Sequence, residues 1–194
     1  SMLRPHQKVA VGLSGGTDSV TLLYFLSNLR KKLPMNLVAI TVDNNLRDKY
    51  TKSIFANAEK LTKELDIPYY KISFKESIGK TLSQISKEKN TKSLCTYCGV
   101  LRRRILNSMA RELGADKLAI GHNLDDTCEM YLLNIIRNEP ERLVRYIKPV
   151  ISDRGLVPRI RPFMAVSKLD IQHYADIHKL KYVVGRCPYA KYSL

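Results

Sequence analysis

The chain has 194 residues, with 33 lysines and arginines against 18 aspartates and glutamates, so its formal net charge is +15. Hydrophobic residues at 44% and charged residues at 26% exclude a wholly disordered, collagen-like or coiled-coil chain. The length fits one well-buried domain, which we expect to span 1–194. Because folding does not require so large an excess of positive charge, the composition indicates a polyanionic partner.

The sequence predicts a cytosolic protein with no membrane partner. No segment approaches the roughly 18 consecutive apolar residues of a membrane-spanning helix. The first residues, SMLRPHQK, contain no apolar stretch of the kind that a secretory signal needs. Since the cytosol keeps thiols reduced, the four cysteines are expected to serve thiol chemistry or metal ligation rather than disulfides.

Short apolar stretches alternate with helical patterns along the chain. Strands are expected at 8–13, 36–43, 69–74, 117–121 and 157–161, and helices at 20–29, 50–66, 99–113, 124–138 and 168–179. A weak helix and a loop are expected over 75–93, and a last extended piece over 181–184. The alternation predicts an α/β fold, a doubly wound, mostly parallel five-stranded sheet with helices on both faces and ligands at the carboxyl ends of the strands.

The segment SGGTDS at 14–19 joins the first expected strand to the first helix. Two glycines and short hydroxyl side chains at such a junction let backbone N–H groups surround an anion at the positive end of a helix dipole. The pattern is neither a Walker motif nor GxGxxG. The structural alternative is a tight turn at Gly15 and Gly16, with Ser14 or Thr17 capping the helix.

Cys95 and Cys98 are spaced three residues apart at the start of a predicted helix, so both sulfurs can face one point. The helix N-terminus is expected to favour their thiolate forms, which makes them candidate ligands or nucleophiles. The alternative is a disulfide between them, with Cys187 merely buried, and spacing alone leaves both open. Cys128 is expected to be a small buried hydrophobe or, less simply, a fourth zinc ligand.

The segment GHNLDD at 121–126 carries two candidate acids at the start of a helix. Capping and the helix dipole explain Asp125, which leaves Asp126 as the candidate functional carboxylate. A hydrogen-bonded loop histidine and a catalytic histidine are equally good interpretations of His122. Gly121, like Gly99 after the cysteine pair, would let backbone approach a nucleotide closely.

Basic residues gather in two places. Arg102 lies four residues after Cys98 and shares its helix face, whereas 102–104 cannot all face inward because consecutive positions are about 100° apart. A second group follows the 124–138 helix and is expected to contact RNA backbone, although a solvated face would look the same. Its members are Arg137, Arg142, Arg145 and Lys148.

SGGTDS resembles the SGGxDS signature of the PP-loop, or N-type, ATP pyrophosphatases, which have the adenine nucleotide alpha hydrolase-like fold. The segments CTYCGVLRRR, GHNLDD, VPRIRPF and CPYA narrow the resemblance to tRNA 2-thiouridine synthetases of the TtuA type and their wobble-uridine relatives. The resemblance covers 8–194. It implies an ATP-dependent tRNA sulfurtransferase that adenylates the C2 oxygen of a tRNA uridine and replaces that oxygen with sulfur.

The resemblance also implies which residues bind the nucleotide and Mg²⁺ at the reaction centre. The nucleotide-binding residues would be Ser14, Gly15, Gly16, Thr17, Asp18, Ser19, Val42, Asp43, Gly99 and Gly121. The adenine would rest against the backbone of Val42 and Asp43. Thr17 departs from the lysine that most relatives carry, a loss that Mg²⁺ or another basic group could compensate.

In these relatives Cys-x-x-Cys and one distal cysteine hold a 4Fe-4S cluster whose fourth iron has no protein ligand. The resemblance therefore assigns the catalytic positions Asp126, Arg102, Cys95, Cys98 and Cys187, with the three cysteines as metal ligands. Protein purified in air would hold zinc or no metal. The alternatives are a persulfide or zinc-type tRNA thiolase, including 2-thiocytidine formation, and an amidating PP-loop ATP pyrophosphatase.

The implied partners are tRNA, a second copy of the chain, since dimers are common among the relatives, and a sulfur donor. That donor would be sulfide or a thiocarboxylated ubiquitin-like carrier. Relatives usually carry zinc-binding Cys/His pairs before and after this region, and 1–194 contains neither pair.

Overall fold

The computed structural model describes residues 2–46, 49–88, 94–141, 143, 155–185, 187 and 189. The strands are β1 (Lys8–Gly12), β2 (Asn36–Asp43), β3 (Tyr69–Ser73), β4 (Lys117–Ala119) and β5 (Arg159–Ile160). The helices are α1 (Thr17–Leu29), α2 (Lys49–Glu64), α3 (Phe74–Ile78), α4 (Leu82–Glu88), α5 (Leu94–Glu112), α6 (Leu124–Ile136) and α8 (Lys168–Ile177).

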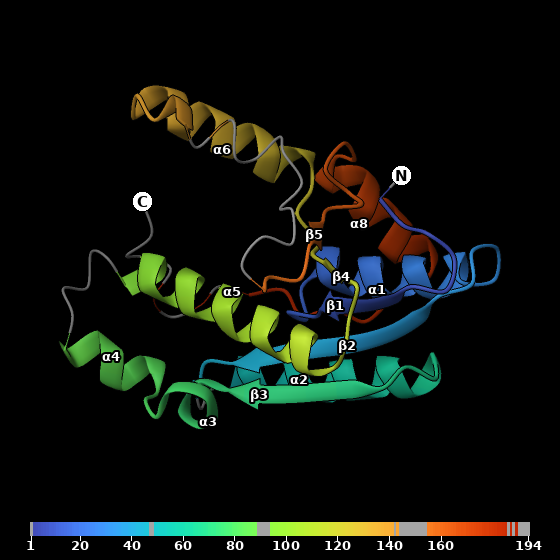
Figure 1. The fold of residues 1–194 in the computed structure, drawn as a ribbon, viewed down its shortest axis with the longest axis horizontal. Coiled ribbons are helices and arrows are strands. Elements are labelled where there is room, and N and C mark those ends of the chain that lie inside the picture. The colour runs from blue at the N-terminus through green and yellow to red at the C-terminus, as the bar shows by residue number, and fades with distance from the viewer. Residues whose placement is uncertain are drawn as a thin grey trace.

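The strands form one five-stranded sheet in the order β3-β2-β1-β4-β5, and every neighbouring pair is parallel (Figure 1). The predicted doubly wound α/β fold is therefore confirmed. The chain builds outward from β1 to β3, then returns to the other side of β1 to add β4 and β5. The carboxyl ends of β1 and β4 thus flank the point where strand order reverses, which is where such sheets bind ligands.

Alternate side chains of the central strands pack against two different helical layers. Val9 and Val11 of β1 join the apolar cluster that contains residues of α1, α2 and α8. Ala10 of β1, with Val38 and Ile40 of β2, joins the cluster formed with α5. This period of two, with both sets almost fully buried, is what a central parallel strand covered on both faces requires.

The structure differs from the expected elements in the middle and at the end of the chain. The weak helix expected within 75–93 is two short helices, α3 and α4, and α5 begins at Leu94, before the cysteine pair. Residues 181–184 add no strand to the sheet. Instead, the Val183 N–H donates to the Gly15 carbonyl at 3.0 Å, which fixes this segment against the loop after β1.

Helix α6 extends away from the sheet and from the other helices (Figure 1). Its exposed side chains include Leu132, Leu133, Ile135 and Ile136. Among the described residues, no helix combines the length and apolar character needed to cross a membrane.

Candidate active site

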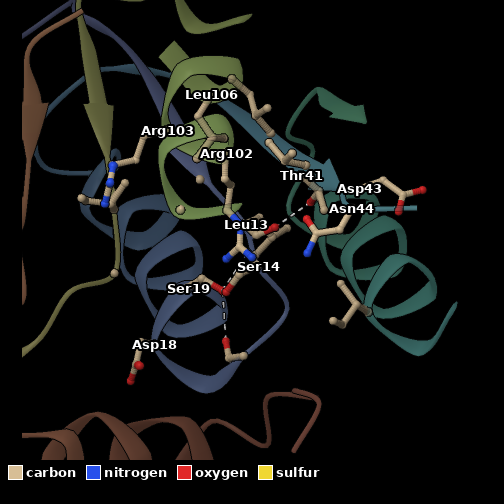
Figure 2. Close-up of a pocket in the computed structure, with 18 of the residues that line it drawn as sticks. Leu13, Ser14, Asp18, Ser19, Thr41, Asp43, Asn44, Arg102, Arg103 and Leu106 are labelled. Atoms are coloured by element: carbon tan, nitrogen blue, oxygen red, sulfur yellow. Dashed lines mark hydrogen bonds between the residues drawn. The ribbon is translucent and has the colours of Figure 1, made fainter. Parts of the chain in front are cut away.

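A cavity of about 480 Å³ opens at the carboxyl ends of the strands (Figure 2). Its walls come from the loop after β1, the ends of β2 and β4, helices α2, α5 and α6, Arg159 of β5, and Cys187. The lining includes these predicted site residues: Ser14, Gly16, Asp18, Ser19, Val42, Asp43, Gly99, Arg102, Gly121, Asp126 and Cys187. The structure thus gathers into one chamber residues that are 173 positions apart in the sequence, from Ser14 to Cys187.

The loop after β1 is held by its own serines. The Ser19 hydroxyl accepts from the Ser14 N–H at 3.1 Å, lies 3.0 Å from the Ser14 hydroxyl, and donates to the Gly16 carbonyl at 3.1 Å. Gly15 has a φ of +81°, and a Cβ atom there would lie 2.7 Å from Ile54, so only glycine fits. Gly15 is buried, and neither it nor Thr17 lines the cavity.

Helix α1 begins without a side-chain cap. Gly16 is its N-cap residue, so the structural alternative in which Ser14 or Thr17 caps the helix is wrong. The first backbone N–H groups of α1 therefore gain no hydrogen bond from a capping side chain, at the end of the helix where the dipole is positive. That arrangement suits an anion in the cavity.

The β2 side of the cavity is mainly apolar. Its lining there includes Ile40, Val42, Ile54 and Phe55, which suits a flat ring such as a purine. The Asp43 carboxylate accepts from the Asn45 N–H at 2.7 Å and lies 3.8 Å from the Lys71 ammonium. Asp43 is thus held by its neighbours at the end of β2, where the backbone of Val42 and Asp43 borders this apolar side.

The acids at the start of α6 have different roles from those expected. Asn123 and Asp126 form a capping box, in which the Asn123 N–H donates to Asp126 Oδ2 at 3.1 Å and the Asp126 N–H donates to Asn123 Oδ1 at 2.9 Å. Asp125 instead accepts from the Lys168 N–H at 2.8 Å, at the start of α8. The expectation that capping explains Asp125 is therefore wrong, and it is Asp126 that both caps α6 and lines the cavity.

Asp18 carries an unsatisfied carboxylate oxygen. Its Oδ1 atom is buried and has no hydrogen-bond partner among the described residues. Burial, followed by the negative charge of Asp126, raises the pKa of Asp18. A Cβ atom on Gly121 would lie 3.0 Å from the Asp18 backbone, so this glycine lets the end of β4 approach the loop. Two carboxylates at one wall of a polar cavity, one with an orphaned oxygen, are donors of the kind that Mg²⁺ accepts.

We expect Asp18→Asn to raise the melting temperature at pH 7 to 8 in the absence of Mg²⁺. Because the pKa of Asp18 is raised above its ordinary 3.8, ionisation of this carboxyl disfavours the folded state from about pH 3.8 upward, and the effect is complete above the folded pKa. The difference from the unchanged chain should shrink as the pH is lowered toward 3.8. Thermal denaturation across this pH range checks the prediction, with Asp125→Asn as the control that gains no stability.

The thiols lie around Arg102. The Arg102 guanidinium donates to Cys98 Sγ at 3.5 Å, and the Cys95 thiol donates to the Tyr189 carbonyl at 3.6 Å. Burial raises the pKa of Cys95, and the neighbouring Cys187 and Cys98 raise it further, while Arg102 opposes the shift. The expectation that the helix N-terminus would favour the thiolate is therefore wrong for Cys95.

The charges of Cys187 and Cys98 both act on the Cys95 thiol, so Cys187 returns to the cysteine pair across the fold. Three neighbouring thiols beside the Arg102 guanidinium are soft donors of the kind that zinc or an iron–sulfur cluster accepts. In the part of the chain that the structure describes, no three cysteine, histidine or acidic side chains stand close enough together to hold a metal ion as they are. Binding would therefore require the three sulfurs to move toward one another.

Cys128 is exposed on α6, so the expectation of a small buried hydrophobe is wrong. Sequence periodicity does not reveal whether any element covers a helix face, and α6 packs on the fold mainly through its first turn. Of the predicted RNA-contacting group, Arg137 ends α6 and is exposed, whereas Arg142, Arg145 and Lys148 lie outside the described residues.

Two charged residues of the cavity lining were not singled out by the sequence, namely Arg103 and Arg159. Spacing from Cys98 distinguished Arg102 from its two neighbours but did not separate Arg103 from Arg104, and Arg159 lay in the VPRIRPF segment without an assigned role. His122 also lines the cavity. Burial among these groups, together with Arg161, Arg159 and Arg103, lowers the pKa of His122, which keeps its ring neutral at pH 7.

Comparison with known proteins gives one match to a family and several close relatives. Residues 2–187 match a family described as the PP-loop domain. A probable sulfurtransferase from Methanocaldococcus jannaschii is 34% identical, over 99% of this chain and 58% of its own length. Cytoplasmic tRNA 2-thiolation protein 1 from Chlamydomonas reinhardtii is also 34% identical, over 99% of this chain and 54% of its own length.

Among solved structures, the U34-tRNA thiolase NcsA from Methanococcus maripaludis, which contains its 4Fe-4S cluster, superposes with a TM-score of 0.85. It is 35% identical and is matched over 97% of this chain and 61% of its own. The chain thus spans little more than half the length of the curated relatives that it matches.

Proposed function

Because the chain belongs to the PP-loop domain family, we propose that it provides the catalytic domain of an ATP-dependent tRNA sulfurtransferase. The substrate would be a tRNA uridine, whose C2 oxygen is adenylated and then replaced by sulfur. The observation that carries the proposal is the shared cavity, in which the loop after β1, with Ser14 and Ser19, meets Arg102, Asp126 and Cys187. Relatives of 34% identity named for sulfur transfer and tRNA 2-thiolation support it.

ATP would lie across the carboxyl ends of β2 and β1. The apolar β2 side would take the adenine, and the phosphates would bind the loop N–H groups and the Ser14 and Ser19 hydroxyls. Figure 2 shows Arg102 pointing toward these two serines, so its guanidinium can stabilise the charge that develops on the α-phosphate. Arg102 would thereby supply the cation that Thr17 does not.

Asp18 would hold Mg²⁺ on the other side of the phosphates, with the negative charge of Asp126 close by. The buried Oδ1 of Asp18 has no partner among the described residues, and the two carboxylates repel each other, so a divalent cation removes an unfavourable arrangement. When bound, Mg²⁺ would neutralise charge on the pyrophosphate leaving group.

The first chemical step would form a bond between the uridine C2 oxygen and the α-phosphorus, while the bond to pyrophosphate breaks. The uracil N3 proton must leave for the adenylated base to be neutral, and we assign its acceptance to the Asp126 carboxylate, which lines the cavity. Asp126 Oδ2 is engaged by the Asn123 N–H, so Oδ1 is the atom left for this proton.

In the second step hydrogen sulfide ion would attack C2, and the bond between C2 and the adenylate oxygen would break, releasing AMP. The proton on the sulfur moves to N3, and the proton held by Asp126 is released to solvent, so atoms and charge balance without an oxidant. Cys95, Cys98 and Cys187 would hold a 4Fe-4S cluster, a group that the donor set fits. Such a cluster would supply an iron without a protein ligand, at which sulfide can be presented to the base.

The remaining expectations stay predictions. The sulfur donor, the homodimer and the cytoplasmic location are inferred for this chain from the resemblance and from the relatives named as cytoplasmic proteins. The amidating alternative needs neither three gathered thiols nor an arginine beside them, so those groups favour sulfur transfer.

The proposal is tested by purifying and reconstituting the chain without oxygen, followed by iron and sulfide analysis. The loaded protein is then incubated with unmodified tRNA, Mg²⁺, ATP and sulfide, and the nucleosides are analysed by mass spectrometry. We expect 2-thiouridine, with one pyrophosphate released for each. Iron-loaded protein that converts tRNA and ammonia into an aminated nucleoside with release of pyrophosphate, and forms no thionucleoside with sulfide, would instead establish amidation.

A further inference from the structure

A second basic group lies in the cavity, apart from the arginine beside Cys98. Arg103 and Arg159 line the cavity, and Arg161 lies close enough to Arg159 for its charge to act on it. Burial, then Arg161 and Arg103, lower the pKa of Arg159. Neither Arg103 nor Arg159 forms an ion pair with any residue that the structure describes. Two guanidinium groups that have no carboxylate partner among the described residues repel each other, so the placement of Arg103 and Arg159 requires another reason.

The backbone explains how the arginines meet. Ile160 of β5 packs into the core with α1 and α8, so Arg159 and Arg161, on either side of it, face the layer of α5. Arg103 runs back along α5, and its guanidinium lies 3.9 Å from the position that a Cβ atom on Gly99 would occupy. Figure 2 shows Arg102 and Arg103 leaving α5 in different directions, with only Arg102 pointing to the serine loop.

Strand order separates this group from the loop that would hold ATP phosphates. β5 is the edge strand on the side of β4 and is two strands from β1, which at ordinary spacing is about 10 Å. One nucleotide, the proposed ATP, would fill the apolar side at β2 and the loop after β1. The arginines therefore border the part of the cavity that a second substrate would enter, at an edge that no further strand covers in the described chain.

We infer that Arg103 and Arg159 form a binding site for a backbone phosphate of the RNA substrate, with Arg161 beside them. The inference rests on the proposed function. Guanidinium groups bind phosphate oxygens in pairs, and two of them at a cavity rim would hold the strand next to the target nucleotide. With its base beside Arg102 and Cys98, the nucleotide would have its phosphate at the neighbouring arginines. His122, neutral at pH 7, adds a hydrogen-bonding group without adding charge.

The test measures binding of unmodified tRNA and of a non-hydrolysable ATP analogue to the full chain and its variants. Arg103→Gln and Arg159→Gln are expected to weaken tRNA binding about 10-fold each. Each should reduce the slope of log affinity against log salt by about 0.7 to 0.9. Binding of the ATP analogue should not change. Arg104→Gln is the matched control, because Arg104 is exposed on the same helix and is not part of the cavity lining.

Melting temperatures show that the variants are folded, and removing one like charge from the group should not lower them. Arg159→Lys keeps the positive charge, so its slope of log affinity against log salt should stay close to that of the unchanged chain. Unchanged tRNA binding in both glutamine variants overturns the inference while the proposed function stands, provided that the unchanged chain thiolates tRNA. An equal loss in Arg104→Gln, or weakened ATP binding instead, also overturns it. No tRNA binding by the unchanged chain would overturn both.

Discussion

Cys187→Ser is expected to remove iron from the reconstituted chain and to lower tRNA thiolation at least about 100-fold. Loss of a group that only hydrogen-bonds to a metal ligand lowers activity by up to about 100-fold, and loss of a ligand itself should have at least that effect. Serine offers a hard oxygen donor where iron needs a thiolate, and the two remaining thiols cannot complete the ligand set. ATP binding should persist, because Cys187 lies at the thiol end of the cavity. Iron content, visible absorbance and 2-thiouridine formation are the measurements.

The segment that carries Cys187 should keep its place in this variant. Val183 is bonded to the Gly15 carbonyl, and Tyr189 packs with the α4 and α5 cluster and donates to the Ser83 hydroxyl at 3.5 Å. Cys128→Ser is the matched control, since Cys128 is exposed on α6 and should lose neither iron nor activity. Full iron content in Cys187→Ser would refute the three-cysteine site, and loss of iron in Cys128→Ser would place a ligand elsewhere.

The sheet was predictable because its strands are buried on both faces. KVAVG and NLVAITVD are runs that no exposed strand would carry, and the structure gives β2 the bounds that the sequence predicted. Strands β4 and β5 are both shorter than expected, at Lys117–Ala119 and Arg159–Ile160, although β4 is a central strand and β5 an edge strand. Apolar runs therefore predict which segments form strands better than they predict where each strand ends.

The predictable parts of the candidate site consist of residues that lie within a few positions of one another in the sequence. The serine loop and the Cys98–Arg102 pair depend on short-range spacing, and both have the expected geometry. The capping box of Asn123 and Asp126 was misassigned because two adjacent aspartates fit the same helix start.

The basic group was not predictable, since it depends on which way each arginine leaves its element. Arg102 and Arg103 are neighbours in the sequence, yet only Arg102 reaches a cysteine. Arg159 enters the cavity because β5 is parallel to β4 and because Ile160 occupies the opposite face. Strand order and the face that each side chain occupies are set by tertiary contacts, and the spacing of residues in the sequence does not predict them.

Asp126→Asn is expected to lower the rate of thiolation by about 10² to 10⁴-fold, the usual contribution of a general base, with much less effect on stability. An asparagine side chain can still accept the Asn123 N–H through its amide oxygen, so helix α6 should lose less than about 1 kcal/mol. It cannot take up the uracil N3 proton, and it repels neither Asp18 nor the phosphates.

The control is Asp125→Asn, which removes a carboxylate from the same helical turn but not from the cavity. Its amide oxygen can keep the hydrogen bond from Lys168, so thiolation should change less than about 3-fold, as for a surface substitution within ±0.5 kcal/mol. Single-turnover rates of pyrophosphate release, measured with saturating tRNA and ATP, isolate the adenylation step. If Asp126→Asn releases pyrophosphate at the unchanged rate but yields no 2-thiouridine, then Asp126 acts in sulfur transfer rather than adenylation. If neither rate changes and only the melting temperature falls, then its role is the capping box alone, since loss of the base must slow a step that moves the N3 proton.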